Sequence, residues 1–221
     1  MAQAERRPEP AVGPRRASPW MDEFWVRRLQ SLLGLIPIGA FLIFHLYVNL
    51  LATQGPTEYN TLINTLEHMP LLIFIEVFVL YLPILFHAAV GFHIVFTPEL
   101  NVTRYPYGRN IHFYLQRLTG VIAFIFLAYH VVTLRLIPGL NDTHVTFALV
   151  QSQLRQTWIL ILYLVGAIGT IYHFANGLWS FAIHWGIAVG RRAQRAMAYV
   201  SAGVFVVLTL VLVRIVLAFA S

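Results

Sequence analysis

The sequence predicts an all-α integral membrane protein with five transmembrane helices. Three observations support this class: 58% of the 221 residues are hydrophobic, five long apolar runs are present, and the arginines lie between those runs. A soluble domain rarely reaches this apolar fraction, and each run is long enough to cross a bilayer as a helix. The predicted helices cover residues 29–51, 71–96, 113–137, 156–185 and 197–220.

The segments between the helices contain residues that end helices. Gly55-Pro56, Met69-Pro70, Thr97-Pro98 and Pro138-Gly139 all lie in these connections. Residues 1–20 are rich in Pro, Arg, Ala and Glu, and no apolar core follows the early arginines as a signal peptide requires. We therefore expect a disordered cytoplasmic tail at 1–20 and one transmembrane domain at 21–221.

The distribution of arginine sets the orientation of the helices. All 15 basic residues are arginine, and 12 of them precede the first helix or lie in or beside the second–third and fourth–fifth connections. Under the positive-inside rule, the N-terminus is cytoplasmic and the C-terminus is outside. The same pattern explains the net charge of +6 without a nucleic-acid partner.

Four histidines lie deep inside the predicted helices, away from their ends, and the chain repeats around them. His45 follows the segment 29–34 (LQSLLG), and His130 follows the related segment 115–120 (LQRLTG). The second and fourth helices match in a histidine followed four residues later by a glycine: His87 and Gly91, His173 and Gly177. The first helix thus resembles the third, and the second resembles the fourth. The fifth carries no histidine and is expected at the periphery of a four-helix bundle.

Depth in the membrane divides the four histidines into two pairs. At 1.5 Å per residue, His45 and His130 each lie ~12 Å from the outer end of their helix. His87 and His173 each lie ~15–16 Å from the inner end. A lone histidine is readily explained by a hydrogen bond to a neighbouring helix, but paired imidazoles at equal depth can bind one haem iron axially. The pairs predict two stacked haems and a path for electrons across the membrane.

The chain contains no cysteine. This excludes disulfides, thiolate-bound iron–sulfur clusters and covalent c-type haem attachment in this chain. Any haem is therefore b-type and is held by ligation and packing alone.

Several other residues are candidates for the haem pockets. Anionic propionates need donors, and the inner ends of the first and third helices supply Arg28, Gln30, Ser31 and Arg117. Arg28 is equally well explained as an anchor in the positive-inside pattern.

Glycines and the remaining histidines have weaker assignments. Gly91 and Gly177 follow proposed ligands by four residues and could make room for a porphyrin, although small residues also allow close helix packing.

His93 and His184 fall near the inner boundary, where a propionate is within reach. His68, His112 and His144 lie in connections or at helix ends and are expected at the solvated surface.

Two carboxylates lie toward the outer side. Glu76 is near the outer end of the second helix, and Glu58 is in the connection before it. A carboxylate near the outer haem could exchange a proton with a quinone, whose two-electron chemistry moves two protons. Glu58 is also explained as a helix-cap or surface acid.

Five segments carry a resemblance to a known family: 27–34 (RRLQSLLG), 85–88 (LFHA), 115–120 (LQRLTG), 129–131 (YHV) and, most specifically, 173–181 (HFANGLWSF). The chain resembles, from about Phe24 onward, the cytochrome b membrane anchor of succinate:quinone oxidoreductase (respiratory complex II), of the single-anchor, five-helix, two-haem kind. The family's four haem ligands fall on His45, His87, His130 and His173. Some members have a histidine in place of Gln30.

The resemblance implies a function that the residues alone do not show. In this family a flavoprotein subunit with FAD oxidises succinate to fumarate, and an iron–sulfur subunit passes the electrons on. The anchor holds both at the cytoplasmic face of the inner membrane and delivers electrons to a quinone, usually menaquinone. Fumarate reduction is also found in the family, and Glu58 matches a position implicated at an outer quinone site. The succinate-oxidising site is then on another chain, and the complex could form a higher oligomer.

Two alternatives remain open from the sequence. A di-haem anchor of a formate dehydrogenase, hydrogenase or nitrate reductase would share the haems but bind different soluble subunits. A haem-free transporter or assembly scaffold would use the histidines structurally. An absorption spectrum separates the second alternative, because a scaffold has no reducible b-type bands.

Overall fold

The computed structural model describes residues 23–96 and 107–220; the tail predicted at 1–20 lies outside them. The described residues form helices and no strand, which confirms the all-α class. Five helical spans are long and apolar enough to cross a membrane, and we number them I to V: Glu23–Gln54, Leu72–Phe96, Gly108–Leu140, Thr157–His184 and Gly190–Ala220. Span V begins earlier than the predicted residue 197 because its first two turns are helical but polar.

Three of the spans change helix type along their length. Span I contains α1 (Glu23–Leu33), the π-helical η1 (Gly34–Ile38), α2 (Gly39–Leu50) and the 3₁₀ turn η2 (Leu51–Gln54). Span II contains α4 (Leu72–Ile75), the π-helical η3 (Glu76–Tyr81) and α5 (Leu82–Phe96); span III contains α6 (Gly108–Val131), the π-helical η4 (Val132–Leu136) and α7 (Ile137–Leu140). Pro37 lies within η1, where it lacks an N–H and its ring crowds the carbonyl one turn back. The wider π turn accommodates this residue.

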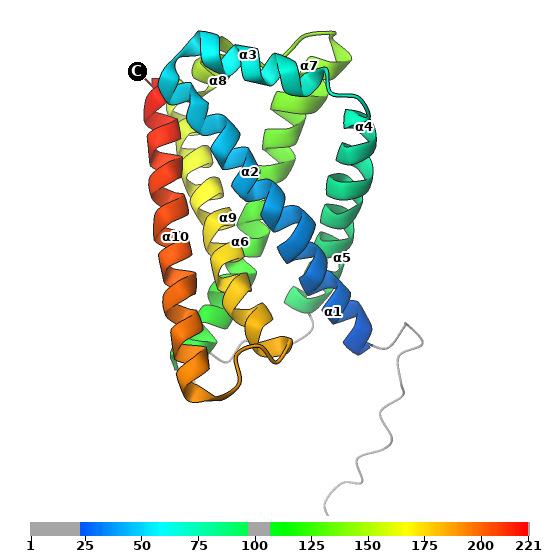
Figure 1. Ribbon diagram of the computed structural model, residues 1–221, viewed down its shortest axis with the longest axis vertical. Helices are drawn as coiled ribbons and strands as arrows, with labels where there is room; N and C mark the ends of the chain where they lie inside the picture. The colour runs from blue at the N-terminus through cyan, green and yellow to red at the C-terminus, as the bar shows by residue number, and fades with distance from the viewer. Residues whose placement is uncertain (1–22, 97–106, 221) are drawn as a thin grey trace, which may run out of the picture.

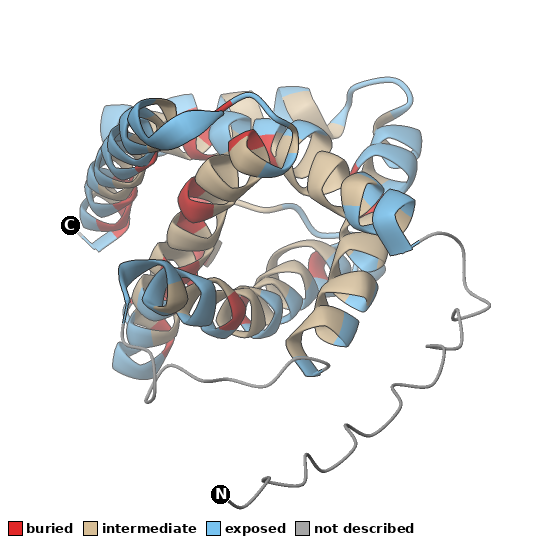
Figure 2. Cartoon of the chain, turned by 90° about the horizontal axis from the view of Figure 1, so that it is seen from below, coloured by how far each residue is buried: buried red, intermediate tan, exposed pale blue. Residues whose placement is uncertain are grey.

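The spans pack as two related pairs. α1 and η1 of span I contact α5, and α6 contacts α9 (Thr157–His184), so spans I and II form one pair and spans III and IV the other. The two pairs match the internal repeat, in which the first two helices resemble the third and the fourth. α10 (Gly190–Ala220) lies outside these four spans and packs against α9 and α2 (Figure 1). Seen along the bundle, exposed residues face outward from the ring of helices (Figure 2).

Two short helices that the sequence did not predict lie at the end of the bundle where span I finishes (Figure 1). They are α3 (Pro56–Glu67) and α8 (Phe147–Leu154). Gly55 starts α3 with a φ of 118°, a conformation suited to glycine, and Pro56 occupies the first helical turn, where its missing N–H costs nothing.

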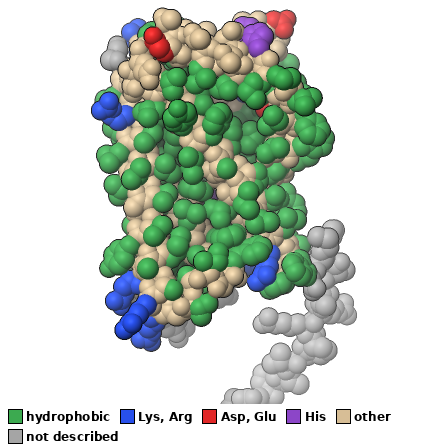
Figure 3. Space-filling view, viewed as in Figure 1, with side chains coloured by type: hydrophobic (Ala, Val, Ile, Leu, Met, Phe, Trp, Pro, Cys, Tyr) green, Lys and Arg blue, Asp and Glu red, His purple; other side chains and the backbone are tan. Residues whose placement is uncertain are grey.

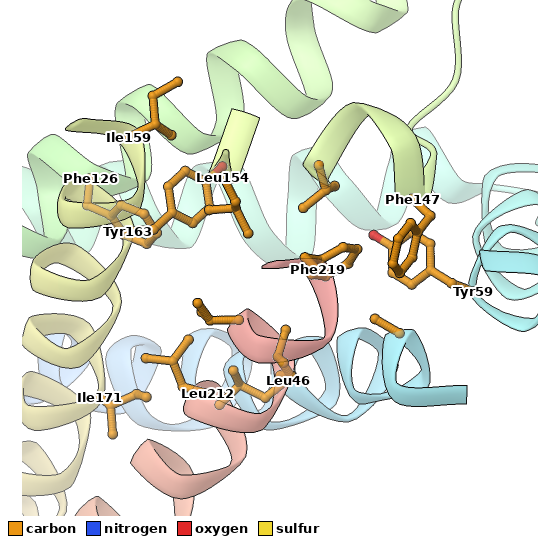
Figure 4. Close-up of a cluster of buried hydrophobic side chains, with 14 residues drawn as sticks. Leu46, Tyr59, Phe126, Phe147, Leu154, Ile159, Tyr163, Ile171, Leu212 and Phe219 are labelled. Atoms are coloured by element: carbon orange, nitrogen blue, oxygen red, sulfur yellow. The ribbon is translucent and has the colours of Figure 1, made fainter. Parts of the chain in front are cut away.

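A cluster of buried hydrophobic side chains lies beneath these two helices. Tyr59 of α3, Phe147 of α8 and Phe219 of α10 contact one another, with ring centroids 4.8–6.0 Å apart (Figure 4). Leu212 of α10 belongs to the same cluster. Span V is therefore peripheral to the histidine-bearing spans, yet it completes the core at this end.

The two ends of the molecule differ in charge (Figure 3). Blue arginine side chains gather at the end where α1 begins and α10 begins, which we call the arginine-rich end, while acidic and histidine side chains appear at the opposite end. Apolar side chains cover the surface between them. This surface is the one expected to face lipid.

Candidate haem-binding site

Two of the four predicted ligands face each other in the half of the bundle nearer the arginine-rich end. His87 of α5 and His173 of α9 have ring centroids 6.1 Å apart and planes at 90°. An imidazole–metal bond is about 2 Å long, and the centroid of the ring lies half a ring width beyond the bonded nitrogen. Two imidazoles that bind one metal from opposite sides therefore have centroids roughly 6 Å apart. The pair therefore fits one iron between its rings.

Each of these two imidazoles makes a hydrogen bond to a backbone carbonyl of the neighbouring helix. His87 Nδ1 donates to the backbone carbonyl of Gln30 at 2.8 Å, and His173 Nδ1 donates to that of Gln116 at 2.9 Å. A backbone carbonyl on one ring nitrogen fixes the tautomer and leaves the other nitrogen free for a metal. Nε2 of both rings is thereby available to a shared ligand.

Glycines explain how the rings come so close to the neighbouring helices. A Cβ on Gly34 would lie 2.6 Å from His87 Nδ1 and closer still to Cε1, and one on Gly120 would lie 2.9 Å from His173 Cε1. The repeated segment Leu-Gln-x-Leu-x-Gly thus supplies a carbonyl and, one turn later, a flat surface for the imidazole. The sequence revealed the repeat but not this role.

One amide network exists in only one half of the repeat. Gln116 Nε2 donates to the carbonyl of His173 at 3.1 Å, and Asn176 Nδ2 donates to Gln116 Oε1 at 2.7 Å. Asn176 is buried, and Val90 occupies the matching position after His87. Gln116 and Asn176 were not identified from sequence, although the presence of Asn176 in the segment HFANG was a usable signal.

The second pair lies nearer the opposite end. His45 of α2 and His130 of α6 have ring centroids 5.6 Å apart and planes at 89°. His130 Nδ1 is 3.2 Å from the hydroxyl of Tyr163, and its Nε2 makes no hydrogen bond within the described parts of the chain. The structure thus brings together the histidines that helix depth had paired.

His45 has a different hydrogen-bond partner. Asn49 Nδ2 lies 3.3 Å from His45 Nε2, the nitrogen that the other three rings leave free. To bind a metal through Nε2, His45 must give up this contact. Tyr59 donates to Asn49 Oδ1 at 3.4 Å, and burial raises the pKa of Tyr59 to about 12, so its hydroxyl keeps the proton that it donates. A polar chain therefore runs from α3 to this ligand.

A buried guanidinium that suits an anionic cofactor follows Gln116 in the chain. Arg117 is only 7% exposed, its Nη2 donates to the carbonyl of Ile94, and its face lies 4.1 Å from the ring of Phe113. Nε and Nη1 have no hydrogen-bond partner within the described parts of the chain. Buried, unpaired cationic donors favour an anionic group, so Arg117 fits its predicted role beside a propionate.

The other predicted pocket residues make contacts with side chains other than His87 and His173. Arg28 stacks on Phe24 and Trp185, and Trp185 Nε1 donates to Ser31 Oγ at 3.1 Å. These contacts occupy the Ser31 hydroxyl and pair the Arg28 guanidinium with two aromatic rings. Gly91 and Gly177 face the amides of Gln30 and Gln116 rather than the imidazoles, at 3.8 and 3.6 Å from an added Cβ. Their role beside a porphyrin stays a prediction.

The remaining histidines are exposed. Surface positions were predicted for His68, His112 and His144, and the structure confirms them. His184 Nδ1 bonds the carbonyl of Ser180, one turn earlier in its own helix. His93 is also exposed.

The two carboxylates occupy different environments. Glu58 is exposed in the first turn of α3, as a helix-start acid would be. Glu76 forms a two-pronged ion pair with Arg135, at 2.8 and 2.9 Å, between spans II and III. The charge of Glu76 is therefore balanced within the protein, whereas Glu58 faces outward.

Comparison with known proteins shows the family of the chain. The family model described as succinate dehydrogenase/fumarate reductase transmembrane subunit matches residues 96–212. The chain is also 42% identical over 197 residues to the succinate dehydrogenase cytochrome b558 subunit of Bacillus subtilis (strain 168), which covers 89% of this chain and 97% of that protein. The chain therefore belongs to the succinate dehydrogenase/fumarate reductase transmembrane subunit family.

Proposed function

We propose that this chain is the cytochrome b anchor that passes electrons from succinate-oxidising subunits to a membrane quinone, menaquinone, with two b haems as carriers. The observation that carries the proposal is the arrangement of two facing histidine pairs at two depths of one bundle. His87 and His173 hold the inner haem, and His45 and His130 hold the outer one. Each haem supplies a one-electron carrier when it is bound.

The residues around the pairs act on binding and orientation. The carbonyls of Gln30 and Gln116 orient the inner imidazoles, and Arg117 offers donors to a propionate. Among the described residues no cluster of three or more His, Asp or Glu side chains is placed to hold a free metal ion. Paired histidines instead suit a metal whose other four ligands come from a porphyrin.

The charge asymmetry supports one orientation. The arginine-rich end faces the cytoplasm under the positive-inside rule, and the C-terminal end of span V faces outside. The flavoprotein subunit with FAD and the iron–sulfur subunit then bind at the arginine-rich end, nearer to His87 and His173. The opposite end, with α3 and His45, is the side for quinone.

Glu58 is the proposed proton-exchange group for the quinone. It precedes Tyr59, which begins the polar chain through Asn49 to His45. Glu58→Gln should slow quinone reduction by roughly tenfold or more while both haems stay bound, because a positioned acid or base contributes at least that much to proton transfer. Turnover with succinate and a soluble quinone measures the effect.

A matched control for this variant is Asp142→Asn. Asp142 is exposed with a φ of 49°, a conformation that Asn also tolerates. This control should turn over normally. Normal turnover in Glu58→Gln as well would remove Glu58 from the reaction.

The function as a whole is tested by purifying the native complex and adding succinate. Reduction of b-type absorption bands, with two haems per anchor chain, is the expected result. Membership of the family argues against formate dehydrogenase, hydrogenase or nitrate reductase anchors, and reduction by formate or hydrogen but not by succinate would reverse that judgement. A colourless preparation would identify a haem-free scaffold.

A further inference from the structure

A hollow lined by arginines lies at the arginine-rich end, away from the histidine pairs. Its volume is about 500 Å³, and it is lined by Arg109, Trp179, Arg191, Gln194, Arg195 and Ala198. These residues come from the first turn of α6, the last turns of α9 and the first turns of α10. The hollow therefore forms where spans III, IV and V meet.

One face of α10 forms a wall of this hollow. Arg191, Gln194, Arg195 and Ala198 follow the spacing i, i+3, i+4, i+7 that places side chains on one side of a helix. Arg192, one residue after Arg191, is exposed and does not line the hollow. The arginines that line the hollow therefore lie on one side of α10. The positive-inside rule requires arginines at this end of the helix but not on one side of it.

The walls of the hollow are connected to one another. Arg109 Nη2 donates to Gln194 Oε1 at 2.7 Å, and Trp179 Nε1 donates to the backbone carbonyl of Gln194 at 3.2 Å. Gln194 thus joins α6, α9 and α10 at one point. The hollow is held in shape by the protein, so a ligand need not organise it.

The charge of the hollow is unbalanced. Among residues 23–96 and 107–220, three guanidinium groups and no carboxylate line the hollow, and the ion pairs found there involve none of these three arginines. Guanidinium groups match phosphate oxygens in geometry and charge. A phosphate group is the anion that this lining fits.

The depth of the hollow identifies the source of the phosphate. The apolar run of span V begins at Met197, beside Ala198, and tryptophan is enriched at the level of lipid headgroups. Beyond the hollow, α10 exposes Val206 and Val213 close to the side of the helix that lines it. A basic pocket between transmembrane helices at this level is suited to an anionic lipid headgroup, with its acyl chains along the apolar surface.

We propose that this hollow binds one anionic phospholipid, with its phosphate on Arg109, Arg191 and Arg195 and its glycerol end against Trp179 and Ala198. The proposal requires only that the chain spans a membrane and does not depend on its haems or on its redox partners. A bound lipid would join three spans at the point where Gln194 already links them.

The test uses the whole complex, purified in mild detergent and depleted of lipid. Dioleoyl-phosphatidylglycerol or dioleoyl-phosphatidylcholine is then added, and bound lipid is counted by native mass spectrometry. The wild type should retain phosphatidylglycerol in preference to phosphatidylcholine. Arg191→Gln with Arg195→Gln should bind phosphatidylglycerol roughly tenfold or more weakly, because charged hydrogen bonds are lost. Arg192→Gln is the matched control and should bind as the wild type does.

A second variant separates charge from shape. Gln194→Glu keeps an acceptor for Arg109 but adds a negative charge to the hollow, so it should also weaken phosphatidylglycerol binding while haem content stays unchanged. Equal phosphatidylglycerol binding in the wild type, the double variant and Gln194→Glu would overturn the proposal. It would also be overturned if the double variant lost the iron–sulfur subunit and kept the lipid, because the arginines would then form a protein contact.

Discussion

His173→Ala is expected to halve the haem b content of the purified complex and to stop succinate-driven quinone reduction. His173 faces His87 at 6.1 Å between ring centroids and is one of only two protein ligands proposed for the inner haem. A b-type haem has no covalent attachment, so loss of an axial ligand removes a main part of its binding energy. The haem-to-protein ratio, read from the reduced absorption spectrum, measures the result.

A histidine on the same helix provides the control. His184 is exposed and bonded to the carbonyl of Ser180, so His184→Ala should retain both haems. The pairing is tested by comparison with other ligands: His87→Ala should remove the same haem as His173→Ala, and His130→Ala should remove the other. Loss of the same spectral component in His173→Ala and His130→Ala would show that the pairs are wrong.

The pairing could be predicted from sequence because depth in a membrane helix is a matter of counting. Once the arginines fixed the direction of each span, a rise of 1.5 Å per residue set the level of each histidine. The bilayer limits the possible levels, and helices that follow one another in the chain tend to pack side by side, which leaves few arrangements. Predicted positions of His45, His87, His130 and His173 therefore agree with the contacts in the structure.

The supporting contacts could not be predicted in the same way. The roles of Gln30 and Gln116 depend on backbone carbonyls, which every residue possesses, and only the packing of spans I on II and III on IV selects these two. The helices α3 and α8 are short and only moderately apolar, so no membrane-length signal marks them. The carbonyl contacts and the two short helices both depend on how distant elements pack against one another. Local sequence patterns do not show this packing.

Gly34→Ala is expected to have the second largest effect, through a single methyl group. The new Cβ would lie 2.6 Å from His87 Nδ1, the atom that donates to the Gln30 carbonyl at 2.8 Å. The imidazole must move, which breaks this hydrogen bond and turns Nε2 away from His173. Overpacking of this kind costs about 1–3 kcal/mol, and the inner haem should be lost or bound weakly while the outer haem remains.

Two glycine variants serve as controls for Gly34→Ala. Gly203 of α10 has open space around its missing Cβ, so Gly203→Ala should leave haem content and thermal stability unchanged. Gly120→Ala places its Cβ 2.9 Å from His173 Cε1 and should weaken the same haem to a smaller extent. Haem content and unfolding temperature, measured together for the three variants, distinguish a local effect at the inner pair from a general loss of folding. If Gly34→Ala kept both haems at wild-type occupancy, the imidazole would not depend on this glycine, and the repeated segment would need another explanation.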